Sequence, residues 1–395
     1  MNVENRGESS ANEMMLFSPL TINKVTLQNR MVFAPTDLEM TPGGFVREQF
    51  TRFNLRRAQA GLGLIIAGAA AVTPSKSGDL FRINTDEFVP ALKEFTDTIH
   101  TESQTKVFLQ ILHYLKLSRS GYRQLVTDLS LDEIREIKQQ FVEGAIRTKE
   151  GGFDGVELHY AHCYTLASFL SAQSNTRTDM YGRTPEGRMR LACEIYNEVR
   201  DAVGKDYVVG CRMNADEFIF GANTLADTIP IALELCGLGL DYLSLSVGGR
   251  FEDAVPPPPG RALDPYSGYS GHRSFPWFYM PTAVNAYLAE AIRKALRDAG
   301  LNTPVMTAGK IPSPDIAEEI LKAGKADMIG LCRPLVCDPE WPKKALEMKW
   351  DEIVPCQYGN HCYRKYTGPR VAAIRCITWP KGSDDQAPYE AQAEW

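Results

Sequence analysis

The sequence predicts an α/β fold, a parallel (β/α)8 TIM barrel. Eight short apolar runs alternate along the chain with eight longer amphipathic stretches. Strands that are each followed by a helix form parallel sheets, and eight such units close into a barrel. An open, doubly wound sheet is the alternative. A doubly wound sheet that binds a dinucleotide usually has a Gly-rich motif after an early strand. No such motif follows any of the early apolar runs, so the barrel is favoured.

Each expected strand is short and apolar throughout, as is typical of strands that are covered on both faces. The strands are expected at residues 31–34, 64–70, 107–112, 155–158, 208–212, 242–246, 304–307 and 328–331. The helices are expected at 48–60, 89–101, 131–150, 185–203, 224–237, 281–299, 312–323 and 339–348. Several of these stretches start with a helix-initiating residue, such as Ser130 or a proline in the first turn.

Two segments do not fit simple strand–helix units. Residues 250–279 form a long loop after strand six, with four consecutive prolines at 256–259, and should lie over the active face as a lid or wall. Residues 350–395 form a C-terminal cysteine-containing extension. We therefore expect a flexible tail at 1–15, a barrel at 16–349 and the extension at 350–395.

Composition excludes some classes of protein. The 395 residues carry a formal net charge of −6, which argues against a nucleic-acid-binding protein. No apolar run approaches the roughly 20 residues of a membrane-spanning helix, and the polar N-terminus lacks the apolar core of a secretory signal. We expect a cytoplasmic protein that acts on a small molecule. A homo-oligomer is compatible with the sequence.

The strongest candidate site is the segment His159-Tyr160-Ala161-His162-Cys163-Tyr164, which directly follows the apolar run 155–158. Two of the six histidines lie here, three residues apart, at the end of a strand where parallel α/β folds place their chemistry. A single histidine is more often a satisfied core residue, and Tyr164 also fits a packing role. The cluster as a whole favours an acid–base or hydrogen-bonding site.

Several segments in barrel order resemble the old yellow enzyme family of FMN-dependent (β/α)8-barrel oxidoreductases. They include LFSPLTINKVTLQNRMVFAPT, GLGLIIAGAAAV, GVELHYAHCY, SNTRTDMYGRTPEGR and MIGLCRPLVCDP. The resemblance implies a tightly bound FMN and NAD(P)H as the reductant. It places the flavin contacts on Pro35, Thr36, Ala69, Gln110 and Arg212, and the phosphate contacts near Gly309, Lys310 and Arg333.

The implied contacts have physical reasons. Gln110 presents an amide donor and an acceptor, and Arg212 supplies a fixed positive charge where negative charge collects on a reduced flavin. The resemblance also implies that His159 and His162 donate to the carbonyl oxygen of a substrate and that Tyr164 supplies a proton. The expected reaction is reduction of an activated C=C bond by hydride transfer through flavin N5.

Two other functions remain open. Asp37 stands where many relatives carry Cys or Thr, and either an inward or an outward side chain fits the sequence. With Glu39 nearby and aromatic residues such as Tyr269 and Trp277 in the long loop, the site would suit a methylated amine, which the protein would oxidise or demethylate. A flavin-binding scaffold without catalysis is the third possibility.

The C-terminal cysteines resemble an iron–sulfur motif of one branch of the family, which contains trimethylamine dehydrogenase and dienoyl-CoA reductase. Cys356, Cys362 and Cys376 match, but Gly359 replaces the second ligand. A [4Fe–4S] cluster normally needs four thiolates, so we favour a remnant site without metal. The alternative is a modified cluster or a zinc ion held by the three thiolates and a neighbour such as His361. We also expect the second, dinucleotide-binding part of that branch to be missing, so that NAD(P)H reduces FMN directly. Cys332 replaces a Gly that usually precedes Arg333.

Overall fold

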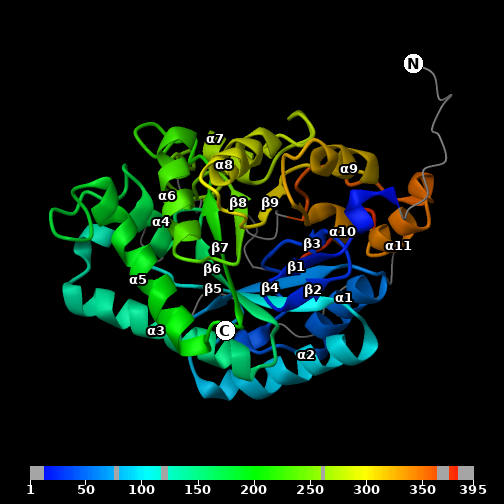
Figure 1. Ribbon diagram of the computed structural model, residues 1–395, viewed down its shortest axis with the longest axis horizontal. Helices are drawn as coiled ribbons and strands as arrows, with labels where there is room; N and C mark the ends of the chain where they lie inside the picture. Colours follow the sequence, from blue (N-terminus) through cyan, green and yellow to red (C-terminus); the bar gives the residue numbers. More distant parts are fainter. Residues whose placement is uncertain (1–12, 75–79, 117–122, 259–262, 363–372, 381–395) are drawn as a thin grey trace.

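A closed barrel of eight parallel strands forms the centre of the protein, surrounded by helices (Figure 1). The computed structural model describes residues 13–74, 80–116, 123–258, 263–362 and 373–380. The barrel strands follow one another in chain order, and β10 closes the barrel by pairing with β3. They are β3 (Met31–Phe33), β4 (Leu64–Ala71), β5 (Lys106–Leu112), β6 (Gly155–Tyr160), β7 (Val208–Asn214), β8 (Tyr242–Ser246), β9 (Val305–Ala308) and β10 (Met328–Leu331). The predicted fold and all eight strands are confirmed.

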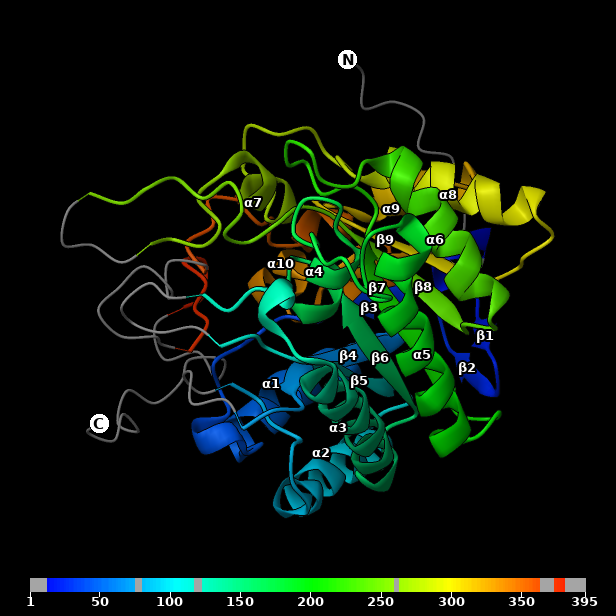
Figure 2. The same cartoon turned by 90° about the vertical axis from the view of Figure 1, so that its left-hand side faces the viewer.

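Eight helices correspond to the expected amphipathic stretches and cover the outside of the barrel (Figures 1 and 2). They are α1 (Glu48–Gln59), α2 (Val89–Glu102), α3 (Leu131–Glu150), α5 (Pro185–Val203), α6 (Leu225–Gly237), α8 (Ala286–Asp298), α9 (Pro314–Lys322) and α11 (Trp341–Leu346). Helix α8 begins five residues later than expected, because Ala283 has a φ of 51° and its N–H bonds the carbonyl of Lys310 at 2.8 Å. That backbone belongs to a turn.

Three short helices were not expected. They are α4 (Thr165–Leu170), α7 (Tyr269–Ser274) and α10 (Arg333–Cys337). Each has five or six residues, too few to leave a periodic pattern in the sequence. All three follow the carboxyl ends of barrel strands, so they contribute to the face where a site is expected.

A β-hairpin seals the opposite end of the barrel. It consists of β1 (Leu20–Ile22) and β2 (Val25–Leu27), and its strands of three residues were also not expected. Ile22 and Leu27 are buried against the inward-facing residues of the barrel floor. Those residues are Val32, Leu64, Ile66, Phe108, Val208, Tyr242, Met306 and Met328. The lower interior is therefore apolar and closed.

Above this floor, one level of the barrel is polar. The strand registers pair Gln110 with Glu157, Glu157 with Gly210, and Gly210 with Tyr242. A Cβ on Gly210 would lie 2.0 Å from the Tyr242 ring, so the ring occupies the space that a side chain on β7 would fill. The Tyr242 hydroxyl thereby reaches across β7 and donates to Glu157 Oε2 at 2.9 Å.

We expect Gly210→Ala to destabilise the fold by about 1–3 kcal/mol, because the new methyl group overlaps a ring that is itself fully buried. Chemical denaturation measures the effect. Gly237→Ala is the matched control, since a Cβ there meets no atom within 4 Å. Equal stability of the two variants would contradict the close packing of Tyr242 on Gly210.

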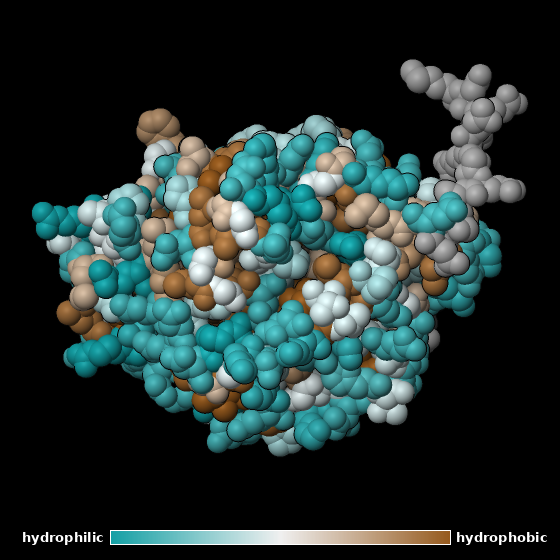
Figure 3. All heavy atoms as spheres, in the orientation of Figure 1, coloured by the Kyte–Doolittle hydropathy of each residue, from teal (hydrophilic) through white to brown (hydrophobic). Residues whose placement is uncertain are grey.

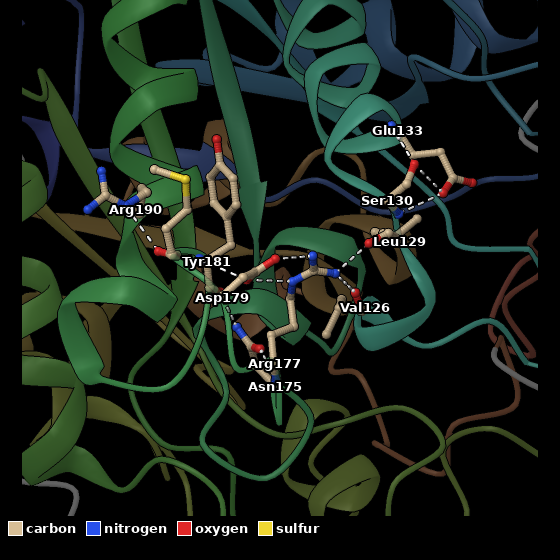
Figure 4. Close-up of polar contacts among 10 residues, drawn as sticks. Val126, Leu129, Ser130, Glu133, Asn175, Arg177, Asp179, Tyr181 and Arg190 are labelled. Carbon is tan, nitrogen blue, oxygen red and sulfur yellow. Dashed lines mark hydrogen bonds and ion pairs between the residues drawn. The ribbon is translucent and has the colours of Figure 1, made fainter.

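The family-like motif SNTRTDMYGRTPEGR, residues 174–188, forms the loop between α4 and α5 and the first turn of α5 (Figure 4). Arg177 donates to the carbonyls of Val126 at 2.7 Å and Leu129 at 2.6 Å, and its Nε donates to Asp179 at 3.0 Å. The hydrogen bond from Arg177 lowers the pKa of Asp179. The motif therefore ties the loops after β5 and β6 together.

The outer surface is mainly hydrophilic on the face that Figure 3 shows, with scattered hydrophobic residues. Among the described residues, no helix has the length and apolar character needed to cross a membrane.

Candidate active site

A cavity of about 260 Å³ opens at the carboxyl ends of the barrel strands. Its floor consists of inward-facing residues of the strands, and its walls come from the loops that follow them. The residues that line it are Pro35, Thr36, Asp37, Glu39, Ala69, Leu80, Gln110, Leu112, Tyr114, His159, His162, Tyr164, Arg212, Arg250, Pro265, Tyr266, Phe275, Cys332, Arg333, Cys362 and Ile374. The volume is near the lower end of small-molecule sites, roughly 300–1,000 Å³.

His159 ends the inward-facing series of β6 and is 4 % exposed. Its Nδ1 lies 3.2 Å from the backbone N–H of Ala161, which can only donate. Nδ1 is therefore the acceptor, and in the neutral ring the proton is on Nε2. Burial, with His162 and Arg212 nearby, holds the pKa of His159 well below its usual value, so the imidazole is a neutral donor.

His162 lies on the loop after β6. It and Cys163 adopt successive left-handed conformations, with φ values of 58° and 54°. Asn214 on β7 accepts from the His162 backbone N–H at 3.2 Å, and the ring Nε2 lies 2.6 Å from Ser246 Oγ on β8. Burial, and then the charges of Arg212 and Arg250, lower the pKa of His162 to about 3.

We expect the free energy of unfolding to fall as pH drops from about 6.5 towards 3. Unfolded His162 takes up a proton near pH 6.5, whereas the folded residue stays neutral down to about pH 3. The unfolded chain binds more protons in this window and is favoured as pH falls. Denaturation of the wild type and His162→Asn at pH 7 and pH 5 measures the effect. The same loss of stability in both would exclude His162 as its source.

Tyr164 stands beside the two histidines. Its ring meets His159 at a centroid distance of 5.0 Å and Tyr114 at 5.1 Å, and the Arg250 guanidinium lies 5.0 Å from its centroid. The Tyr164 hydroxyl is 3.4 Å from that of Tyr266. The ring is thus held on three sides, and its hydroxyl faces the wall formed by the long loop after β8.

Six of the eight residues expected to hold the cofactor line the same cavity: Pro35, Thr36, Ala69, Gln110, Arg212 and Arg333. Arg212 donates to Ser244 at 3.4 Å and Ser246 at 3.3 Å, and is 8 % exposed. Its Nε is buried and has no hydrogen-bond partner among the described residues. A buried guanidinium N–H that lacks an acceptor fits a site whose ligand supplies one.

Gly309 and Lys310 lie outside the cavity lining. Gly309 has a φ of 124°, and a Cβ there would lie 2.6 Å from Asn285 Nδ2. The ammonium of Lys310 donates to the carbonyls of Phe278 and Met280, so its side chain fastens the long loop. Of the three residues expected to contact the phosphate, only Arg333 lines the cavity. Its guanidinium also donates to the Pro276 carbonyl at 2.8 Å.

The two aromatic residues expected in the substrate site lie outside the cavity lining. Tyr269, the first residue of α7, is 59 % exposed and packs against Phe218. Trp277 packs on His272. Neither lines the cavity, and Tyr266 and Phe275 of the same loop do so instead.

Asp37 lines the cavity, as does Glu39. Asp37 accepts from the Glu39 backbone N–H at 3.0 Å, and both carboxylates raise the pKa of Tyr114, although burial is its largest cause. Asp37 thus borders the cavity, and the direction of its carboxylate relative to a flavin stays a prediction.

A comparison with known families matches the model of the NADH:flavin oxidoreductase / NADH oxidase family over residues 15–126, 114–256 and 282–352. The chain belongs to this family. The resemblance to old yellow enzymes is confirmed, whereas the branch within the family stays a prediction.

Relatives in the family differ in length. The chain is 33 % identical to an NADH oxidase of Thermoanaerobacter brockii, over 86 % of this chain and 52 % of that protein. It is 34 % identical to an NADPH dehydrogenase of a Geobacillus strain, over 84 % of this chain and 94 % of that protein. The chain thus spans about half the length of several curated relatives that it matches. A 2-naphthoyl-CoA reductase structure shares the fold, with a TM-score of 0.79 and 24 % identity over 93 % of this chain and 57 % of that one.

Three residues in or beside the cavity were not predicted from the sequence. Arg250 and Tyr114 line the cavity, and Glu157 is fully buried next to Gln110. Glu157 did leave a signal, because a charged residue inside an apolar strand needs partners in the fold. Arg250 and Tyr114 are brought to the site by loops, so no local pattern marks them.

The cysteines of the extension are only partly described, since residues 363–372 fall outside the described ranges. Cys362 and Ile374 line the cavity, and the Ile374 N–H donates to the Leu38 carbonyl at 3.0 Å. Cys356, Cys362 and Cys376 were the expected remnant ligands. Within the described residues, no three His, Cys, Asp or Glu side chains are grouped as a metal site would require. Loss of the cluster stays a prediction.

Proposed function

We propose that the protein is an FMN-dependent NAD(P)H oxidoreductase that reduces an activated C=C bond. One observation carries this proposal: His159, His162 and Tyr164 border the same cavity as Gln110 and Arg212. The NADH oxidase and NADPH dehydrogenase relatives support the use of a nicotinamide reductant.

The lower part of the cavity suits a flavin. When bound, FMN supplies the ability to accept a hydride from NAD(P)H and deliver it to a second substrate. Gln110 would bind the pyrimidine edge with one acceptor and one donor, and Arg212 would hold positive charge beside it. Arg333 would bind the phosphate.

The upper part suits an unsaturated carbonyl compound. Neutral His159 presents Nε2–H, and His162 borders the same space, so the two rings bind a carbonyl oxygen without carrying charge themselves. Donors fixed in a dry site stabilise negative charge that develops on that oxygen. Tyr164 holds a proton on its hydroxyl next to this position and supplies it to the α-carbon.

A visible spectrum of the purified protein tests the proposal. We expect flavin absorbance, bleaching by NADH or NADPH in the absence of oxygen, and recovery of the absorbance when a simple enone such as 2-cyclohexenone is added. A protein that takes up no FMN would refute the proposal, and bleaching without recovery would refute C=C reduction.

Oxidation of a methylated amine is the second candidate. It is favoured by Asp37 and Glu39 in the cavity lining, together with the aromatic residues Tyr114, Tyr266 and Phe275. Carboxylates and aromatic faces attract a methylated ammonium group, at about 0.5–2 kcal/mol per well-placed ring.

The same spectra separate the candidates. Bleaching by dimethylglycine or trimethylamine without NAD(P)H would support amine oxidation, whereas an enone reductase should not respond. FMN uptake with no turnover of either substrate would support a flavin-binding scaffold.

A further inference from the structure

Glu157 is a fully buried carboxylate that the proposed reaction does not use. It lies in the middle of β6 and is 0 % exposed. Removing a charge from water is costly unless the interior supplies hydrogen bonds and an opposite charge. The barrel provides both for Glu157: Gln110 and Tyr242 donate hydrogen bonds, and Arg212 supplies the opposite charge. Of these three, Gln110 and Arg212 line the cavity.

Both carboxylate oxygens of Glu157 accept a hydrogen bond. Gln110 Nε2 donates to Oε1 at 2.6 Å, and the Tyr242 hydroxyl donates to Oε2 at 2.9 Å. The second bond is possible because Gly210 has no side chain, so the Tyr242 ring occupies the space beside β7 and its hydroxyl reaches Glu157. Four neighbouring strands therefore hold one carboxylate in a defined position.

This arrangement sets the direction of the Gln110 amide. An ionised carboxylate only accepts, so the amino group of Gln110 turns towards Glu157. The Gln110 carbonyl oxygen and its second N–H are then left for the cavity, which Gln110 lines. With a neutral amide at position 157, which both donates and accepts, the Gln110 side chain could present either its carbonyl oxygen or its amino group to the cavity.

Glu157 also lies next to the site's central positive charge. It pairs in register with Gly210, and Arg212 is the next inward-facing residue on β7. Burial raises the pKa of Glu157, while Arg212, Tyr242 and Gln110 act in the opposite direction. Burial likewise lowers the pKa of Arg212, and Glu157 opposes that change. Each charge thus offsets the cost of burying the other.

We propose that Glu157 is a positioning residue for the flavin, which fixes the direction of the Gln110 amide and balances the charge of Arg212. This inference rests on the proposed function, because it assumes that FMN binds above Gln110 and Arg212. The assignment is specific: the carboxylate charge sets the redox potential of the bound flavin, and the hydrogen bonds set its affinity.

Glu157→Gln tests the role of the charge, since it keeps the size of the side chain. We expect the midpoint potential of bound FMN to shift to more positive values, because Arg212 then favours the negatively charged reduced form without opposition. We expect the Kd for FMN to rise on the order of tenfold, as for one lost charge-assisted hydrogen bond. Equilibration with a reference dye gives the potential, and fluorescence quenching on reconstitution gives the Kd.

Tyr242→Phe removes the hydrogen bond to Glu157 Oε2 and so tests the contribution of the hydrogen bonds. It also provides a second test if Glu157→Gln does not fold. It keeps the charge, so the potential should stay at the wild-type value while the Kd for FMN rises. Thr96→Ala is the control, because Thr96 makes a buried 2.7 Å hydrogen bond to Gly151 O outside the barrel interior. It should lower stability and change neither readout.

The outcomes are distinct. Wild-type potential and Kd in Glu157→Gln, or an unchanged Kd in Tyr242→Phe, would overturn the role of Glu157 and leave the proposed function standing. An equal shift of the potential in both variants would also overturn it, since packing and not charge would then be the cause. A wild-type protein without affinity for FMN would overturn both proposals.

Discussion

Replacing His159 by Ala is expected to lower kcat/KM for an enone by about 10²–10³-fold, the usual effect of removing one donor from a developing negative charge. The imidazole is buried, neutral and held in one tautomer by Ala161, so its Nε2–H is fixed before the substrate arrives. Steady-state kinetics with 2-cyclohexenone and NADPH measure the loss. FMN content should stay unchanged.

His162→Ala should cause a loss of the same order, and the double variant should lose less than the product of the two, because both rings act on one oxygen. His162→Asn keeps an N–H donor and tolerates the left-handed backbone, so it should retain more activity. His100→Ala is the control, since His100 lies on an outer helix and pairs with Asp154. Full activity in His159→Ala would contradict the oxygen-binding role.

Tyr164→Phe is expected to lower the turnover of an enone by roughly 10²–10⁴-fold, the range for loss of a general acid. Its ring is held by His159, Tyr114 and Arg250, so the phenylalanine should occupy the same position without the proton. Stopped-flow measurement of enone reduction gives the effect.

A second electron acceptor, ferricyanide, distinguishes loss of proton transfer from general damage to the site. NADPH oxidation by ferricyanide requires no proton transfer to a substrate carbon, so Tyr164→Phe should support it at the wild-type rate. A parallel loss with both acceptors would show that the variant disturbs the site as a whole. Tyr266→Phe, which removes the neighbouring hydroxyl at 3.4 Å, should have a much smaller effect on the enone.

The barrel was predictable because a parallel strand covered on both faces leaves a run of apolar residues, and eight such runs were separated by long amphipathic helices. The short elements were not. Hairpin strands of three residues and helices of five or six are decided by what they pack against, as Ile22 and Leu27 are by the barrel floor. Local sequence carries little information about such contacts.

In the candidate site, too, residues on strands were easier to predict from the sequence than residues on loops. Gln110, His159 and Arg212 are strand residues, so their inward direction follows from register, and they do line one cavity. Tyr269 and Trp277 belong to an aromatic-rich loop whose path the sequence does not define, and it is Tyr266 and Phe275 of this loop that line the cavity. Lys310 was expected at a phosphate, but its ammonium bonds two loop carbonyls.

The contact of the C-terminal segment with the cavity has a consequence for directed evolution. Ile374 reaches the lining while its backbone bonds Leu38, and Trp379 anchors the same segment by donating to the Val336 carbonyl at 2.7 Å. Position 374 belongs to no barrel strand or helix. A library that varies this position would reshape the cavity lining from outside the barrel strands and helices. Ile374 is only 5 % exposed and packs in the main hydrophobic cluster, so polar or smaller residues selected there are expected to lower stability as well.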